Sequence, residues 1–296
     1  MNEIVILSGK GGTGKTSLAA TLAVLAGDKA VIADCDVDAA NLHLILKPDY
    51  LKSSDFFSGV LAVINQDVCI QCGRCAEICR FQAIVNDKGK YKIIELNCDG
   101  CGYCEKVCRV RAIAMHKRKS GMVFISNTRA GNMMVHARLG IGSENSGKLV
   151  TKVKSDARNL AITLQKEYII VDGSPGIGCP VVASLAGADY VLLVTEPTMS
   201  ALHDLERMVL VMEKFRIRAG CIINKSDLNE KVTQDIRNFL AAKNIDHLAD
   251  IPYDNTFTMA MIEGKTIVEM PTYLKSTVRD IWSGIKEKIK SLNSLL

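Results

Sequence analysis

The sequence lacks the features of a membrane or exported protein. No apolar run among its 296 residues approaches the roughly 18 residues that a membrane-spanning helix needs. The apolar stretch at residues 4–7 is too short for a signal peptide and leads directly into a glycine-rich loop. We therefore expect a chain that starts at Met1, stays in the cytoplasm and makes no stable membrane insertion. With 48% apolar and 23% charged residues, it is also neither disordered, collagen-like nor a coiled coil.

Net charge is absent from most of the chain. Residues 60–120 hold 11 Lys and Arg against 6 Asp and Glu, a balance of +5 that equals the formal net charge of the whole chain. The remainder is neutral, which argues against nucleic-acid binding, because such binding needs a basic face. None of the 5 His residues stands in a pattern that suggests a catalytic triad.

Cysteine, in contrast, is abundant, with 11 residues. A cytosolic compartment keeps thiols reduced, so metal ligation is a better expectation than disulfides. Eight cysteines form two C-x₂-C-x₂-C-x₃-C copies that lie 29 residues apart and share 8 of 17 positions. The first copy contains Cys69, Cys72, Cys75 and Cys79, and the second contains Cys98, Cys101, Cys104 and Cys108. We call residues 60–120 the cysteine module.

The spacing of the module resembles that of bacterial ferredoxins with two [4Fe–4S] clusters, in which each fourth cysteine ligates the other cluster. The resemblance implies one cluster on Cys69, Cys72, Cys75 and Cys108, and a second on Cys98, Cys101, Cys104 and Cys79. Arg80 and Arg109 stand where ferredoxins usually have proline, and their charge would offset part of the clusters' negative charge. Structural zinc is the alternative, since four-cysteine sites also bind Zn²⁺.

Outside the module, short apolar runs alternate with helical patterns. The expected strands are residues 3–8, 30–33, 123–126, 168–171, 190–195 and 220–223, and the expected helices are 15–25, 151–165, 201–215, 230–243 and 278–292. This alternation predicts an α/β fold with a doubly wound, mostly parallel sheet. A small α+β ferredoxin-like domain, residues 60–120, would interrupt it between parts 1–59 and 121–296. We expect residues 132–148 to form a glycine-rich loop.

A phosphate-binding loop follows the first expected strand. It is Gly9-Lys10-Gly11-Gly12-Thr13-Gly14-Lys15-Thr16, followed by Ser17, and it opens a helix. Successive backbone N–H groups of such a loop surround phosphate oxygens, and the helix N-terminus adds a positive dipole end. Lys15 would reach the β- and γ-phosphates of a nucleotide, and the Thr16 hydroxyl would bind Mg²⁺.

The early Lys10 makes this loop resemble the deviant Walker motif of MinD/ParA-type ATPases, relatives of the nitrogenase iron protein. The resemblance covers about 235 residues, all except the module. It implies that Lys10 reaches the nucleotide of a partner subunit, in a homodimer or a heterodimer with a similar ATPase. It also implies that Asp36 positions the attacking water and that Asp34 supports the Mg²⁺ shell. Asp38 stays an alternative to Asp36, and a solvated loop or helix cap is the alternative for each carboxylate.

Further motifs complete the expected nucleotide site. Asp172 ends an apolar strand, as the Mg²⁺-binding Walker B residue does, and residues 173–176 resemble switch II. Asn224 lies where the family contacts the purine, and Pro252 lies where it places a loop beside the base. Residues 224–227 also match the guanine-reading N-K-x-D pattern, so the motif leaves ATP and GTP open, although the family favours ATP.

Three weaker features have competing interpretations. Cys179 lies at the spacing of a bridging-cluster ligand in the nitrogenase iron protein, or is a free cysteine. Residues 116–119 are a solvated basic loop, or a docking patch for an acidic redox partner. The last helix, with Trp282, Ile285 and Ile289, packs on the sheet, or binds a membrane surface.

The leading hypothesis is a Mg²⁺-dependent ATPase that uses ATP/ADP and two [4Fe–4S] clusters. Its dimer switch would drive electron transfer to a redox partner, or the handling of a metallocluster on a partner protein. The alternatives are a ParA/MinD-like positioning or partitioning switch with a structural metal module, and an Fe–S assembly scaffold.

Overall fold

In a computed structural model the chain forms two compact units. The structure describes residues 1–37, 40–140 and 146–293. The first unit contains Met1–Ser54, Val123–Arg138 and the chain from Ser146 onward, and the second contains Asp55–Met122 with Leu139 and Gly140. Strands β3 (Lys52–Ile64) and β6 (Ile113–Asn127) have residues in both units.

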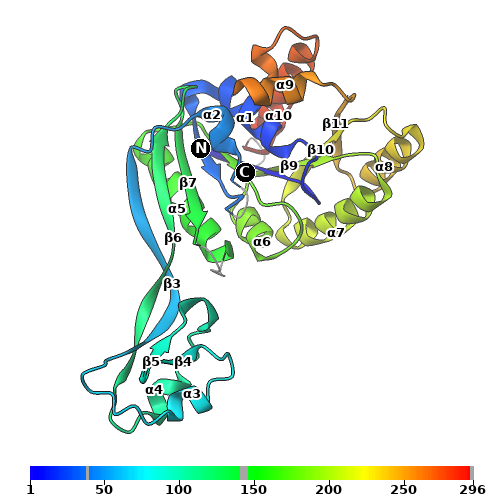
Figure 1. The fold of residues 1–296 in the computed structure, drawn as a ribbon. Helices are drawn as coiled ribbons and strands as arrows, with labels where there is room; N and C mark the ends of the chain where they lie inside the picture. Colours follow the sequence, from blue (N-terminus) through cyan, green and yellow to red (C-terminus); the bar gives the residue numbers. More distant parts are fainter. Residues whose placement is uncertain (38–39, 141–145, 294–296) are drawn as a thin grey trace. The chain divides into compact units, whose positions relative to one another are not determined.

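A nine-stranded sheet, counted over the described residues, organises the chain in the order β11-β10-β9-β1-β8-β2-β7-β6-β3 (Figure 1). Its other strands are β1 (Asn2–Leu7), β2 (Ala30–Asp34), β7 (Met133–Leu139), β8 (Tyr168–Asp172), β9 (Tyr190–Thr195), β10 (Arg218–Asn224) and β11 (Asp246–Ile251). The pairings from β11 through β1 and β8 to β7 are parallel. Strands β2, β8 and β9 are buried along their whole length, as apolar parallel strands covered on both faces must be.

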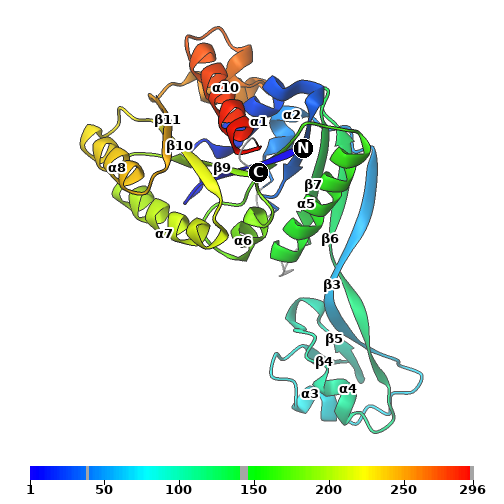
Figure 2. The same ribbon diagram turned by 180° about the vertical axis from the view of Figure 1, so that it is seen from behind.

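Helices cover both faces of this sheet, which confirms the predicted mostly parallel α/β arrangement. The helices of this unit are α1 (Lys15–Ala26), α2 (Leu42–Leu46), α5 (Ser146–Thr163), α6 (Cys179–Leu185), α7 (Met199–Phe215), α8 (Glu230–Ala242), α9 (Thr256–Glu263) and α10 (Leu274–Asn293). Alternate strand residues such as Ile4, Ile32 and Ile170 share one core with α1, α2 and α10, and Figure 2 shows α10 alongside α1. The opposite side receives α5, α6 and α7, which contact β2, β1 and β9.

The second unit is built from short elements. It contains α3 (Arg74–Glu77), α4 (Tyr103–Val107) and the antiparallel hairpin of β4 (Ile84–Asp87) and β5 (Lys90–Ile93). Lys88 and Gly89 form the hairpin turn, with φ of 51° and 83°, and two successive positive φ angles are the geometry of a tight type I′ turn. Equivalent glycines, Gly73 and Gly102, adopt left-handed conformations immediately before α3 and α4, so the two sequence copies fold alike.

Two sequence expectations about loops are wrong. Residues 132–148 are not simply a glycine-rich loop, because Met133–Leu139 form β7, which pairs with β2 and buries Met134; residues 141–145 lie outside the described residues. Residues 116–119 are part of β6 rather than a solvated loop. Arg118 donates to the carbonyl oxygens of Cys98 and Glu95 at 3.1 and 3.2 Å, and Lys119 pairs with Asp55.

The last helix packs on the sheet, as predicted. Trp282, Ile285 and Ile289 are buried, and the Trp282 ring meets that of Tyr168 edge-on at 5.2 Å. In the part of the chain that is described, no helix combines the length and the apolar character needed to cross a bilayer.

We expect the Arg129–Glu269 ion pair to make stability depend on pH. Arg129 bonds both carboxylate oxygens of Glu269 at 2.7 Å and lowers the pKa of Glu269 from 4.5 to about 2, although burial opposes this. Because the folded-state pKa is depressed, the stabilisation is complete above pH 4.5 and is lost as pH falls through about 2. Glu269→Gln should cost about 1–2 kcal/mol at pH 7, the size of a partly screened bidentate pair.

Urea unfolding between pH 2 and 7 measures this difference. The matched control is Glu263→Gln, which breaks the more exposed pair with Lys265. Equal losses of unfolding free energy for the two variants at pH 7 would contradict the prediction.

Candidate functional site

The phosphate-binding loop lies between β1 and α1, at the carboxyl edge of the parallel strands. Gly12 and Gly14 have φ of 81° and 94°, a left-handed conformation that glycine adopts without strain. A Cβ atom on Gly14 would lie 2.6 Å from the Asn224 side-chain nitrogen, and one on Gly9 would lie 2.4 Å from the Asp204 Cβ. Gly14 therefore favours glycine for both conformation and space, and Gly9 for space alone.

Lys15 points into the carboxyl edge, where its side chain is only 6% exposed. Its ammonium nitrogen lies 2.6 Å from Asp172 Oδ1 and 3.6 Å from Asp36 Oδ2. Burial lowers the pKa of Lys15, but Asp172, Asp36 and Asp34 together raise it above its ordinary value. Lys15 is therefore charged, and the structure brings it together with all three carboxylates that the sequence predicts for this site.

Asp34 and Asp172 end neighbouring strands and are paired in register. Oδ2 of each is buried and has no hydrogen-bond partner within the described residues. Burial, and next the charge of Asp172, raise the pKa of Asp34 well above its ordinary value. Two unpartnered carboxylate oxygens at this edge of the sheet are suitable ligands for Mg²⁺, which prefers oxygen. The residues present thus fit the expected cation.

The segment around Asp36 and the 173–176 loop both contact this edge. Asp36 is held by its backbone N–H, which donates to Asp34 Oδ1 at 3.2 Å. In the 173–176 loop, the Ser174 hydroxyl donates to the Cys35 carbonyl at 2.6 Å and the Gly176 N–H donates to the Ser8 carbonyl at 3.0 Å. Asp38, the alternative water-positioning residue, lies outside the described residues.

The predicted base-binding residues lie beside the same loop. The Asn224 side-chain amide donates to the Thr13 carbonyl at 2.8 Å, and Lys225 Nζ donates to the Gly12 carbonyl at 3.0 Å. Asp227 accepts a 2.6 Å hydrogen bond from the Tyr253 N–H, which fixes the turn that contains Pro252 against the end of β10. Asn224 therefore contacts the phosphate loop, and Pro252 directly follows Ile251, the residue paired with Asn224.

Sequence reasoning missed Glu196, the residue that follows β9. Its carboxylate pairs with Lys10 at 2.7 Å and with Lys225 at 2.9 Å. The one signal in the sequence was its position, since it directly follows an apolar strand, as Asp172 ends another.

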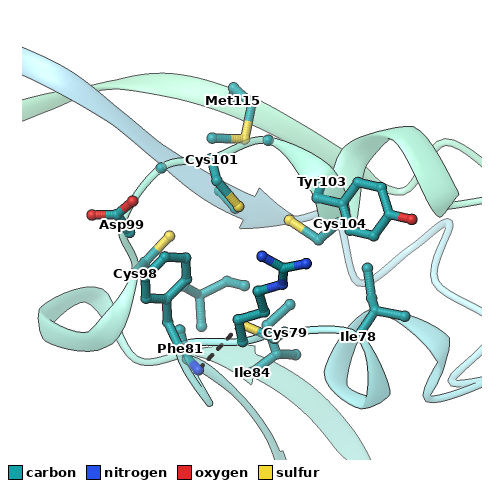
Figure 3. Close-up of a pocket in the computed structure, with 16 residues that line it drawn as sticks. Ile78, Cys79, Phe81, Ile84, Cys98, Asp99, Cys101, Tyr103, Cys104 and Met115 are labelled. Carbon is teal, nitrogen blue, oxygen red and sulfur yellow. Dashed lines mark hydrogen bonds between the residues drawn. The ribbon is translucent and has the colours of Figure 1, made fainter.

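The eight module cysteines line two cavities in the second unit. One, of about 380 Å³, is lined by Cys79 together with Cys98, Cys101 and Cys104 (Figure 3). The other, of about 560 Å³, is lined by Cys69, Cys72, Cys75 and Cys108. Each cavity thus contains three cysteines of one copy and the fourth cysteine of the other copy.

The two fourth cysteines have matching surroundings. The Ala83 N–H lies 3.4 Å from Cys79 Sγ, drawn as a dashed line in Figure 3, and the Ala112 N–H lies 3.2 Å from Cys108 Sγ. Such N–H donors favour a thiolate. Burial raises the pKa of Cys75 and of Cys104, the third cysteine of each copy.

The remaining cysteines differ in environment. Cys35 and Cys221 are buried in the core, and burial raises the pKa of both thiols, as expected for structural residues. Cys179 is exposed at the start of α6, so it is not a buried core cysteine, and its role as a cluster ligand stays a prediction. Over the described residues, no three His, Cys, Asp or Glu side chains are close enough to hold a single metal ion.

Comparisons with known proteins identify the family of the chain. Residues 4–267 match the family model described as "CobQ/CobB/MinD/ParA nucleotide binding domain". An uncharacterized protein of Methanocaldococcus jannaschii, MJ0578, is 32% identical over 289 residues, 97% of each chain. The septum site-determining protein MinD of Buchnera aphidicola is 27% identical over 240 residues, 80% of this chain and 64% of that protein.

A solved structure shows the same fold. The septum site-determining protein MinD of Pyrococcus horikoshii, complexed with Mg-ADP, superposes with a TM-score of 0.58 at 18% identity, over 96% of this chain and 95% of that one. The phosphate loop, Asp172 and the mostly parallel sheet agree with this relationship. The chain belongs to the CobQ/CobB/MinD/ParA nucleotide-binding family and is a P-loop ATPase.

Proposed function

We propose that this ATPase is a Mg²⁺-dependent dimer switch of the MinD/ParA type, which positions or partitions a bound partner. The observation that carries the proposal is the buried Lys15 among Asp34, Asp36 and Asp172, with Lys10 on the same loop. The septum-site function named for two of the similar proteins favours such a switch over an electron-transfer role. The dimer would be a homodimer or would include a similar ATPase.

The contacts of Lys15 suggest how the nucleotide binds. Lys15 would exchange its 2.6 Å contact with Asp172 for the β- and γ-phosphates of ATP. Asp172 and Asp34, released from the ammonium group, would help to hold Mg²⁺ with Thr16, and this ion neutralises phosphate charge. Asp36 would orient water in line with the γ-phosphate, and the 173–176 loop would respond to that phosphate through its backbone.

Lys15→Ala should lower the ATP hydrolysis rate by about 100- to 1,000-fold, because it removes the main cation for the γ-phosphate. Phosphate release at saturating Mg-ATP measures the rate. Lys29→Ala is the matched control, since it removes an exposed lysine that is paired with Glu167 on the same unit. Normal turnover in Lys15→Ala would exclude this loop as the hydrolytic site.

Asp36→Ala should retain ATP binding but lose turnover, so that an ATP-bound dimer accumulates. Sedimentation with Mg-ATP would show the dimer persisting in the variant while the wild-type dimer decays as ATP is consumed. Wild-type turnover in Asp36→Ala would transfer the water-positioning role to Asp38.

The cysteine module supports a second candidate function. We infer that residues 60–120 form a ferredoxin-like domain with two [4Fe–4S] clusters, held by the crossed sets of cysteines that line the two cavities. Arg80 lines the first cavity and Arg109 the second, so each set has a cation that offsets cluster charge. Nucleotide binding would then be coupled to electron transfer, or to metallocluster handling, with a partner protein.

Metal analysis of anaerobically purified protein separates the two candidates. About eight iron and eight acid-labile sulfides per chain would support the clusters and the redox partner. About two zinc ions without sulfide would instead make the module a structural adaptor of the positioning switch.

Paired substitutions test the crossed ligation. Cys79→Ala with Cys104→Ala alters one set, so about four iron atoms per chain should remain. Cys75→Ala with Cys79→Ala alters both sets, so both clusters should be lost. Ligation within each copy would give the reverse result.

A further inference from the structure

Glu196 is the shared counter-ion of two lysines at the nucleotide site. Its side chain is 12% exposed, and each carboxylate oxygen contacts a different lysine, Oε1 with Lys10 at 2.7 Å and Oε2 with Lys225 at 2.9 Å. Burial raises the pKa of Glu196, but hydrogen bonds from Lys10 and Lys225 outweigh this and lower it below its ordinary value. The carboxylate is therefore ionised at neutral pH.

Both lysines are also connected with the phosphate loop, one as a residue of the loop and the other by a hydrogen bond to it. Lys10 belongs to the loop, and Lys225 donates to the Gly12 carbonyl at 3.0 Å. Lys10 Nζ further contacts the Thr198 and Ser200 hydroxyl oxygens at 3.1 and 3.4 Å, at the start of α7. Three acceptors from the β9–α7 connection thus surround the Lys10 ammonium within its own chain, and Glu196 is the charged one.

We propose that Glu196 restrains Lys10 in its own subunit and thereby sets the ATP concentration and protein concentration at which the dimer forms. This inference rests on the proposed dimer switch, together with the role that the family resemblance implies for Lys10, which is to reach the nucleotide of a partner subunit. One ammonium group cannot contact Glu196 and a partner's phosphates at the same time. The free energy of the internal pair is therefore subtracted from that of dimer formation.

Glu196 is a positioning residue in this view, and Lys225 competes for it. Because Lys225 occupies Oε2, it weakens the attraction that Glu196 exerts on Lys10. Removing the Lys225 charge should strengthen the restraint, whereas removing the Glu196 charge should release it. A merely structural role for Glu196 would not produce opposite effects from the two substitutions.

The test is the dimer dissociation constant of the full chain, measured by sedimentation with Mg²⁺ and a non-hydrolysable ATP analogue. Glu196→Gln should tighten the dimer about two- to fivefold, the range expected for one partly exposed ion pair. Lys225→Gln should weaken it. Glu213→Gln is the matched control, because Glu213 forms a similar 2.9 Å pair with Lys243 away from the phosphate loop.

A double substitution tests whether Glu196 acts on the dimer through Lys10. In a Lys10→Ala background, Glu196→Gln should no longer change the dissociation constant, because the residue through which it acts is absent. Glu196→Asp, which retains the charge, should remain close to the wild type and shows that the site tolerates substitution.

Failure of the Glu196 restraint can be distinguished from failure of the proposed dimer switch. A dimer that forms in the wild type but is unchanged or weaker in Glu196→Gln overturns the restraint and leaves the switch intact. The same follows if Glu196→Gln acts equally in the Lys10→Ala background. No analogue-dependent dimer in either the wild type or Glu196→Gln overturns the proposed dimer switch, and the restraint with it.

Discussion

The buried ammonium group of Lys15 is the charge on which the nucleotide site depends. Parallel strands bring Asp34 and Asp172 to one edge of the sheet, and Asp36 follows within two residues. Carboxylates buried so closely repel one another unless a cation lies among them, and the free-energy cost of burying them unpaired is large. Lys15 supplies that cation. A nucleotide with Mg²⁺ would replace one internal set of ion pairs by another, so the site is prepared for exchange.

Lys10, the other lysine of the phosphate loop, has a carboxylate partner of its own. Lys10 pairs with Glu196 at the end of β9, while Lys15 pairs with Asp172 at the end of β8. Both lysines come from one loop of eight residues, and each finds its carboxylate on a different strand. The loop is therefore held between two ion pairs, of which the Lys15 pair is buried and the Lys10 pair is partly open to solvent. A more exposed pair is weaker and easier to break.

The cysteine module is too small to be stabilised by an apolar core alone. Its helices have only four and five residues, and many of its large apolar side chains, including Phe81 and Tyr103, are exposed. So short a repeat cannot form a sufficient core unaided. The crossed arrangement, in which each cavity contains cysteines of both copies, means that any metal group bound there would join the two copies. The uneven charge along the sequence fits this view, because cations beside each cavity would offset the charge of metal-bound thiolates.

The sequence determined the features that local patterns encode. The glycine positions of the phosphate loop, the apolar strands that end in Asp34 and Asp172, and the spacing of the eight cysteines follow from residue type and period. The buried strands β1, β2, β8, β9 and β10 and the five longest helices were therefore predicted, whereas β3, β4, β5, β7, β11 and the short helices were not. Tertiary structure alone decided the contacts between distant segments. Glu196 meets Lys10 only because β9 pairs with β1, a neighbour remote in sequence. Likewise, the sequence predicts a glycine-rich loop where β7 forms. Pairing with β2 buries Met134 in this strand, and a strand depends on such partners, which lie far away in the sequence.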